Sequence, residues 1–206
     1  MKKLLQIHAS IHSDNGQSSL LANRFVEGWR KANPGLEIVV RDLARDPVPH
    51  LDAARFGAFL AKPGEHTPEQ ARAVGYSDVL IQELKDADIV VLGLPMYNFG
   101  VPSTLKAYFD HVARAGVTFR YTEKGPVGLL TGKRVLVFAT RGGLYAGTPK
   151  DTQTTYVRDF FSFLGIDDVQ FVYAEGLAIS PDSKEQSLGT AHAHIDRLGT
   201  LERHAA

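Results

Sequence analysis

Residues 88–95 read DIVVLGLP and are followed at residues 96–100 by a short loop, MYNFG. Every position from Ile89 to Leu94 is apolar or glycine, whereas a strand with one solvent face would alternate polar and apolar residues. The run is therefore typical of a central strand in a sheet that is covered by helices on both faces. Four more runs have the length and composition of strands. The five expected strands span residues 3–9, 36–40, 88–95, 134–140 and 169–174.

Segments with apolar residues at helical spacing lie between these strands. Leu21, Phe25 and Trp29 recur in this way after the first strand. Thr67, followed by a proline and then by Gln70 three residues after the cap, has the form of a capping box that begins a helix. The alternation of strand and helix predicts parallel strands joined by right-handed crossovers. Further helices are expected over residues 67–87, 103–115, 152–164 and 183–202.

The composition suits a single α/β domain over residues 1–206. Lys and Arg together number 23, as do Asp and Glu, so no net charge favours a nucleic acid or a membrane. The absence of cysteine excludes thiolate ligands, and the eight histidines are scattered, so no metal site is expected. Because Gln6 and His8 interrupt the first apolar run, we expect a strand rather than a signal peptide, and a cytoplasmic protein. Residues 46–66 and 118–133 are expected to be irregular pocket walls, lids or interfaces.

The loop after the first strand has the features of a phosphate site. It begins at Ser10, and the next helix begins near Gly16, Gln17, Ser18 and Ser19. The free N–H groups and the dipole of a helix N-terminus favour an anion. No Lys or Arg and no nucleotide-binding glycine motif is present here, so a monophosphate fits better than a triphosphate. Taken alone, this loop favours the alternative that Ser18 or Ser19 only caps the helix.

The loop after the third strand contains Met96, Tyr97, Asn98 and Phe99. A sulfur atom and two aromatic rings can wall a flat heterocycle, while an amide bonds to its polar rim. The alternative is that Met96 or Phe99 packs into the core.

The loop after the fourth strand contains Thr140, Arg141, Gly142 and Gly143. Two glycines allow a close backbone approach with N–H groups aimed at a ligand, and the arginine would stabilise negative charge there. A Gly-Gly turn is also an ordinary end to a strand. All three loops leave the same edge of the predicted sheet, which is where such folds bind ligands. A phosphate cradle, an aromatic wall and rim donors together fit FMN.

In order along the chain, these motifs resemble those of the FMN-dependent NADH azoreductase and quinone reductase family. The resemblance covers nearly the whole chain. It implies a flavodoxin-like three-layer sandwich, with a five-stranded parallel sheet in the order 2-1-3-4-5 and helices on both faces. The matching segments are Gln17-Ser18, the quartet 96–99, residues 113–121, Arg141-Gly142-Gly143 and residues 174–176.

The resemblance also implies roles for particular residues. Ser10, Gly16, Gln17 and Ser18 are expected to bind the FMN phosphate, although Gly16 stands where relatives carry serine. Residues 96–99 are expected to border the isoalloxazine, and residues 140–143 to meet its pyrimidine edge. The family is homodimeric with sites at the interface, and Tyr121 and Phe163 are expected to complete the substrate pocket there. The alternative for Phe163 is a place in the core.

The expected activity is a ping-pong transfer of two electrons from NADH or NADPH to quinones and aromatic azo compounds. Because FMN performs the hydride chemistry, no catalytic side chain is expected. A flavodoxin-type electron carrier is the first alternative, and the balanced charge argues against the acidic docking face of such carriers. A receiver-type signalling domain would need clustered acidic residues after the first strand, where Ser10 and His12 stand instead. A module without a ligand is the third alternative.

Overall fold

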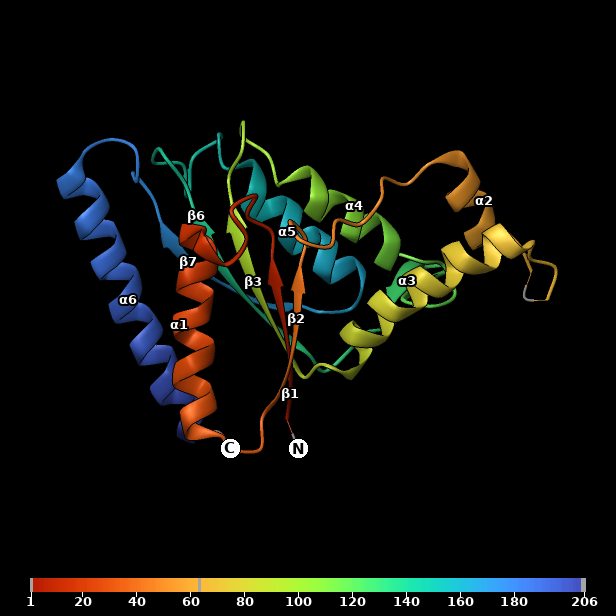
Figure 1. Ribbon diagram of the computed structural model, residues 1–206, viewed down its shortest axis with the longest axis horizontal. Helices are drawn as coiled ribbons and strands as arrows, with labels where there is room; N and C mark the ends of the chain where they lie inside the picture. Colours follow the sequence, from red (N-terminus) through yellow and green to blue (C-terminus); the bar gives the residue numbers. More distant parts are fainter. Residues whose placement is uncertain (1, 63, 205–206) are drawn as a thin grey trace.

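The computed structural model describes residues 2–62 and 64–204. The five strands of the main sheet alternate with helices along the chain, as the sequence predicts (Figure 1). The elements are β1 (Lys3–His8), a 3-10 turn η1 (Ser13–Asn15), α1 (Gln17–Ala32), β2 (Glu37–Asp42), α2 (Ala53–Leu60), α3 (Pro68–Asp86), β3 (Ile89–Pro95), α4 (Ser103–Val112), β4 (Phe119–Thr122), β5 (Gly125–Gly128), β6 (Arg134–Thr140), α5 (Thr152–Phe163), β7 (Asp168–Ala174) and α6 (Pro181–His204).

Five parallel strands form the central sheet in the order β2-β1-β3-β6-β7. The predicted order numbered the strands without β4 and β5, so its fourth and fifth places are held by β6 and β7. All five strands point the same way, and their carboxyl ends lie at the top of Figure 1. The loops after β1, β3 and β6 therefore emerge at one edge of the sheet.

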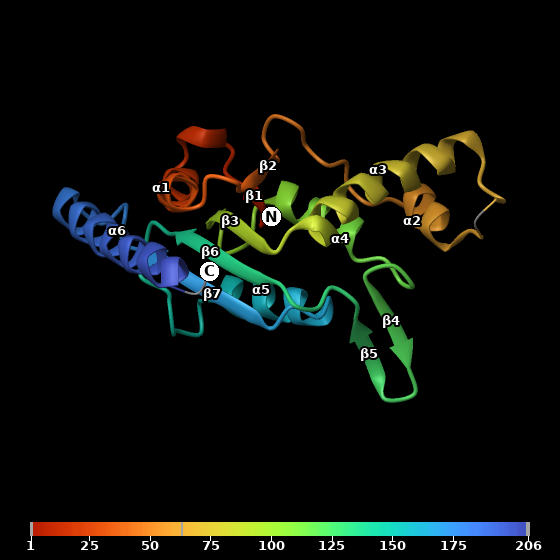
Figure 2. The same cartoon turned by 90° about the horizontal axis from the view of Figure 1, so that it is seen from below.

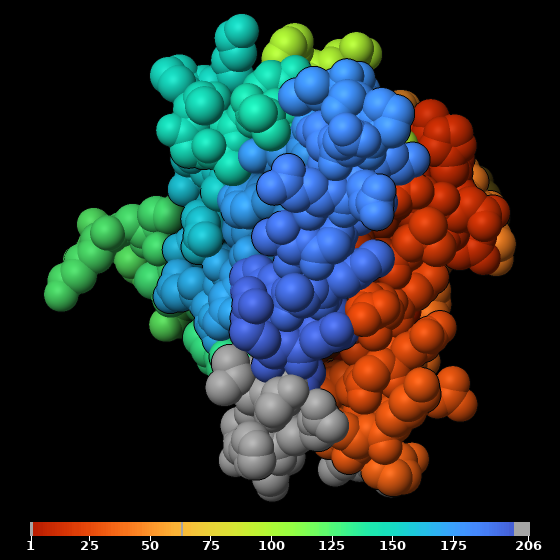
Figure 3. Space-filling view, turned by 90° about the vertical axis from the view of Figure 1, so that its left-hand side faces the viewer, coloured from red at the N-terminus to blue at the C-terminus, as the bar shows by residue number. Residues whose placement is uncertain are grey.

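Two apolar layers enclose the sheet. On one face, Leu21, Phe25 and Trp29 of α1 are buried together with Ala191 and Ile195 of α6. Figure 3 shows these two helices side by side on that face. The opposite face is covered by α3, α4 and α5, and Val90, Leu92 and Leu94 of β3 belong to that core. The expectation of a two-sided apolar strand is therefore confirmed for β3, whose residues are all buried.

The capping box of α3 is present as predicted. The Thr67 hydroxyl accepts a hydrogen bond from the Gln70 N–H at 3.2 Å, and the Gln70 side chain accepts one from the Thr67 N–H at 2.9 Å.

The expectation of two irregular stretches is wrong in part, because residues 46–66 contain α2 and residues 118–133 contain the antiparallel β4–β5 hairpin. Figure 2 shows the hairpin projecting away from the main sheet. Its base is held against the end of α5, since the Leu130 N–H donates to the Leu164 carbonyl at 2.8 Å. A Cβ at Gly128 would lie 2.0 Å from the Gly165 nitrogen, so this close approach requires glycine.

Candidate functional site

The three loops at the carboxyl edge of the sheet contact one another. The Tyr97 hydroxyl oxygen accepts a hydrogen bond from the Ile11 N–H at 3.2 Å and lies 3.4 Å from the Ser10 Oγ. On the other side, the Met96 N–H donates to the Thr140 carbonyl at 3.0 Å. The residues expected after β1, β3 and β6 are therefore brought to one place.

The N-terminus of α1 has backbone donors without partners. Its cap is Gly16, which supplies no side-chain hydrogen bond. The first bond of the helix joins the Leu20 N–H to the Gly16 carbonyl, and the N–H groups of Gln17, Ser18 and Ser19 have no acceptor within residues 2–62 and 64–204. Such free donors at a helix N-terminus favour an anion.

The two serines at this terminus do not act as helix caps. The Ser19 hydroxyl donates to the Ser13 carbonyl at 2.6 Å. The Ser18 hydroxyl is buried and has no hydrogen-bond partner in the described part of the chain. The alternative that Ser18 or Ser19 only caps the helix is therefore wrong. A buried hydroxyl without a partner, beside three free N–H groups, fits a phosphate group.

Two glycines determine the position of the phosphate cradle, the set of donors at the start of α1. A Cβ at Gly16 would lie 2.1 Å from the Ser10 Oγ, so a serine here would displace the Ser10 side chain. Gly16 can therefore contribute only its backbone groups to a ligand, and the absence of a side chain leaves room for the Ser10 hydroxyl. Beneath the first turn of α1, a Cβ at Gly93 would lie 3.1 Å from the Ser18 carbonyl oxygen. The helix start is consequently seated directly on β3.

Residues 97–100 form a tight turn at the end of β3. Tyr97 and Gly100 exchange backbone hydrogen bonds of 3.2 and 3.0 Å, and the two central residues have positive φ angles, 49° at Asn98 and 63° at Phe99. Two-residue turns of this geometry normally carry glycine in the second central place, so Phe99 is strained. Its ring is 52% exposed and Met96 is only partly buried, so the alternative of core packing is not met.

Side chains of α5 hold this strained turn. The Gln153 amide donates to the carbonyls of Pro95 and Gly100, both at 2.9 Å, and the Thr152 hydroxyl donates to the Phe99 carbonyl. Neither residue was predicted to support the site. The sequence contains one signal for them, because Asp151 stands directly before this helix as a cap.

The glycines after β6 present open donors, but the arginine does not. The N–H groups of Gly142 and Gly143 have no acceptor within the described residues, and Gly142 is exposed. The Arg141 side chain is fully buried and pairs with Asp151 at 2.7 Å and Glu175 at 3.1 Å. Nη1 and Nη2 of the guanidinium are thus engaged with carboxylates, whereas its buried Nε has no partner within the described residues, and a contact of this side chain with a ligand stays a prediction.

Burial and ion pairing shift two pKa values near the site. Burial alone would raise the pKa of the Asp151 carboxyl, but hydrogen bonds from Arg141 and Thr154 outweigh it and lower that pKa. His8, at the end of β1, has a pKa lowered by burial, against the opposing influence of Asp42. Asp151 is therefore ionised and His8 neutral at pH 7.

Tyr121 and Phe163 do not join these loops within one chain. Both pack against Phe119, with ring centroids 5.5 and 4.3 Å away, at the base of the β4–β5 hairpin. Phe163 ends α5, which begins at Thr152 beside the loops, so it lies about 16 Å further along the helix axis. Tyr121 is 74% exposed, and Phe163 is partly buried.

The sequence matches the flavodoxin-like fold family over residues 2–198. It is 54% identical over 197 residues to an FMN-dependent NADH:quinone oxidoreductase of Cellvibrio japonicus, covering 96% of this chain and 98% of that protein. A protein of the same name from Alcanivorax borkumensis is 53% identical, covering 93% and 97%. The chain belongs to the FMN-dependent NADH:quinone oxidoreductase family.

A solved structure supports this assignment of the oxidoreductase. The FMN-dependent NADH-azoreductase of Bacillus anthracis, solved in complex with FMN, superposes with a TM-score of 0.89 at 31% identity. The alignment covers 98% of this chain and 100% of the azoreductase chain. The predicted family is thus confirmed, and the relatives do not favour an electron carrier.

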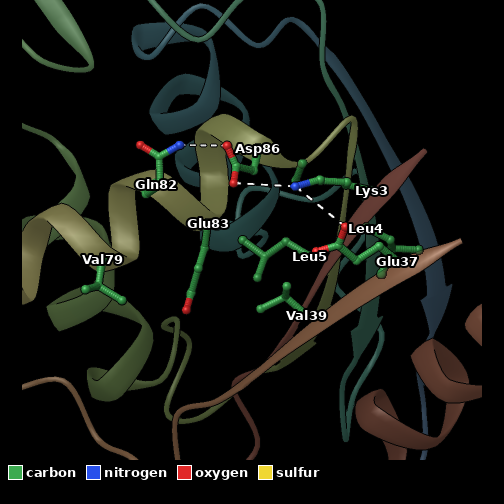
Figure 4. Close-up of a pocket in the computed structure, with 10 residues that line it drawn as sticks. Lys3, Leu4, Leu5, Glu37, Val39, Val79, Gln82, Glu83 and Asp86 are labelled. Carbon is green, nitrogen blue, oxygen red and sulfur yellow. Dashed lines mark hydrogen bonds and ion pairs between the residues drawn. The ribbon is translucent and has the colours of Figure 1, made fainter. Parts of the chain in front are cut away.

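The opposite edge of the oxidoreductase sheet carries a separate hollow of about 240 Å³ between β2 and α3 (Figure 4). Lys3 crosses it, 3.6 Å from Glu37 and 3.7 Å from Asp86. None of the predicted site residues lines it. Among residues 2–62 and 64–204, no cluster of His, Asp and Glu could hold a metal ion, and no helix is long and apolar enough to cross a bilayer.

Proposed function

We propose that the chain is one domain that binds FMN at the carboxyl edge of the sheet and uses it as an NAD(P)H:quinone oxidoreductase and azoreductase. The observation that carries the proposal is the N-terminus of α1, with its unpartnered N–H groups and Ser18 hydroxyl, joined by Tyr97 to the aromatic turn after β3. Ser10, Gly16, Gln17 and Ser18 would hold the phosphate. The curated relatives and the azoreductase structure, which are FMN-dependent by name, support the same cofactor.

The ring of the flavin would lie between two of the loops. Met96, Tyr97, Asn98 and Phe99 would border its face and rim, and residues 140–143 would approach its pyrimidine edge with the N–H groups of Gly142 and Gly143. Hydrogen bonds from these donors stabilise negative charge on the reduced ring, each contributing on the order of 1.5–3 kcal/mol. The Arg141 side chain takes no direct part in this contact.

When bound, FMN supplies the hydride chemistry, so the chain's own residues bind, orient and exclude water rather than act as acid or base. The exposed ring of Phe99 offers a surface on which a nicotinamide and then a flat acceptor can stack in turn. Sharing one space leads to ping-pong kinetics. A quinone takes one NADH and an azo bond takes two. The proposal includes a cytoplasmic location, where reduced nicotinamides are available.

We infer further that two copies associate and share their sites. Phe56 and Leu60 of α2 are 52% and 64% exposed, and the hairpin carries the exposed rings and side chains of Tyr121 and Val127. A second copy would cover this apolar surface. Tyr121 and Phe163 would then complete the pocket of the partner, since they lie apart from the loops of their own chain. Sedimentation should give the mass of a dimer, and Val127→Glu on the hairpin should weaken it, whereas Val79→Glu on α3 should not.

Two measurements test the proposed function, namely the identity of the bound flavin and the rates of NAD(P)H oxidation with each acceptor. The purified protein should be yellow, and heat should release FMN that is identified by its chromatographic mobility. Rates should be measured with NADH and with NADPH, each against a quinone and an azo dye. Double-reciprocal plots of the rate against donor concentration, at several fixed acceptor concentrations, should give parallel lines. A protein that ignores added FMN would contradict the proposal. A flavin-loaded protein without NADH oxidation would support the electron carrier instead.

A further inference from the structure

We propose that Arg141 is a positioning residue that joins the two loops holding the flavin ring, acting through Glu175 and Asp151 without touching the ring. The inference rests on the proposed function, since it concerns where the ring is held. In place of the expected direct contact between Arg141 and the flavin, the arginine would act on the flavin through the loops that it positions.

The guanidinium is enclosed by its partners. Its side chain has no exposed area, and its two carboxylate partners are 7% and 14% exposed. Nη2 donates to Asp151 at 2.7 Å and to the Thr154 hydroxyl at 3.2 Å, Nη1 donates to Glu175 at 3.1 Å, and the group stacks 5.1 Å from the Tyr173 ring. Removing one member would leave a buried charge without its partner, which is strongly unfavourable.

The Glu175 arm organises the loop after β6. Its Oε1 accepts hydrogen bonds from the N–H groups of Tyr145 and Ala146, both at 2.9 Å, in addition to the bond from Arg141. Tyr145 in turn meets the Phe99 ring edge to face, with centroids 5.6 Å apart. The position of Glu175 thus determines the course of the loop that contains Gly142 and Gly143.

The Asp151 arm organises the turn after β3. Its carboxylate caps α5 by accepting from the Thr154 N–H at 3.1 Å. This cap orients the first turn of the helix, where Thr152 and Gln153 bond to the backbone of the strained turn containing Phe99. The Arg141 guanidinium therefore positions both the loop after β6 and the turn after β3, the two segments that the flavin ring would contact. Within residues 2–62 and 64–204, the guanidinium itself makes no hydrogen bond or ion pair with the phosphate-binding residues at the start of α1.

Arg141→Lys tests this role because lysine keeps the charge but lacks the planar fork that reaches two carboxylates. Apoprotein should be titrated with FMN and with riboflavin, and the midpoint potential of the bound flavin should be measured. We expect both affinities to fall by the same factor, roughly tenfold for a loss of about 1.4 kcal/mol, and the potential to fall because the Gly142 and Gly143 donors are misplaced. A role confined to stability would lower Tm and leave the potential unchanged.

Arg158→Lys is the matched control, because Arg158 also stacks on an aromatic ring, Phe171 at 5.0 Å, but bonds to the Val169 carbonyl away from the loops. It should leave both affinities and the potential unchanged. If Arg141→Lys does not fold, Glu175→Gln, which keeps an oxygen for Tyr145 and Ala146, should show the same equal loss of FMN and riboflavin affinity. Wild-type affinity in the folded variant would overturn the inference, whereas a wild-type protein that binds neither flavin would overturn the proposed function itself.

Discussion

The hydroxyl oxygen of Tyr97 accepts a hydrogen bond from the backbone N–H of Ile11 at 3.2 Å, which ties the turn after β3 to the loop after β1. Tyr97→Phe removes this bond and keeps the ring. A neutral hydrogen bond contributes about 0.5–1.5 kcal/mol, so FMN affinity should fall by roughly two- to tenfold, measured by fluorescence titration. Tyr108→Phe is the control, because that hydroxyl is buried in the core without a hydrogen-bond partner in the described chain, and this variant should bind FMN as the wild type does. Equal affinity of the Tyr97 variant and the wild type would show that the tie does not support the cofactor.

Ser18→Ala should weaken FMN more than riboflavin. The Ser18 hydroxyl is buried and unpartnered, and a hydrogen bond from it to a charged phosphate is worth on the order of 1.5–3 kcal/mol. The FMN dissociation constant should therefore rise by roughly ten- to a hundredfold. Riboflavin has no phosphate and serves as the control ligand for the same variant. Equal losses for the two ligands would contradict the phosphate role.

Phe99→Gly and Phe99→Ala together isolate the strain in the turn. Both remove the ring, but only glycine adopts the 63° φ angle without a steric cost of about 1–2 kcal/mol. The glycine variant should be the more stable of the two by about that amount in urea unfolding, and both should reduce quinones more slowly than the wild type. Equal stability of the two variants would mean that the positive φ angle costs nothing.

Stability should fall as the pH drops below about 6.5. Burial lowers the pKa of His8 and of His111, so the unfolded chain takes up these protons at a higher pH than the folded chain does. The stability that the neutral histidines support is present above the unfolded pKa and is lost as the pH falls toward the folded one. Each histidine steepens the dependence by at most about 1.4 kcal/mol per pH unit. Urea unfolding between pH 7.5 and 5.5 should show a shallower slope for His8→Gln than for the wild type, and an unchanged slope would exclude His8 as a source.

The apolar runs and the helical spacing were sufficient to predict the sheet and most helices, because burial on both faces leaves a clear pattern in β3 and β6. The hairpin left no such pattern. It has only two strands, most of its residues are exposed, and Pro126 stands within β5, which argues against a strand in sequence. Helix α2 has eight residues and contains Gly57, so its helical signal is also weak.

The loops were predicted to converge because the carboxyl ends of parallel strands share an edge, and the structure places them in contact. The role of Arg141 could not be read in the same way. Its neighbours Gly142 and Gly143 suggested a ligand, whereas its partners Asp151 and Glu175 lie 10 and 34 residues away along the chain. Ion pairing at that separation depends on the tertiary fold and leaves no local signal.

Because the start of α1 packs on Gly93, β3 fixes the distance between this helix start and the aromatic turn. The helix start rests beside Gly93, and Met96, just before the aromatic turn, follows three residues later along the chain, which corresponds to about 10 Å of extended chain. Neither end can slide, since backbone meets backbone at the glycine and the turn is tied to α5. Under the proposed function, the distance between the bound anion and the ring would be fixed by β3, and this edge of the sheet would select molecules by the length of the spacer that connects their two ends.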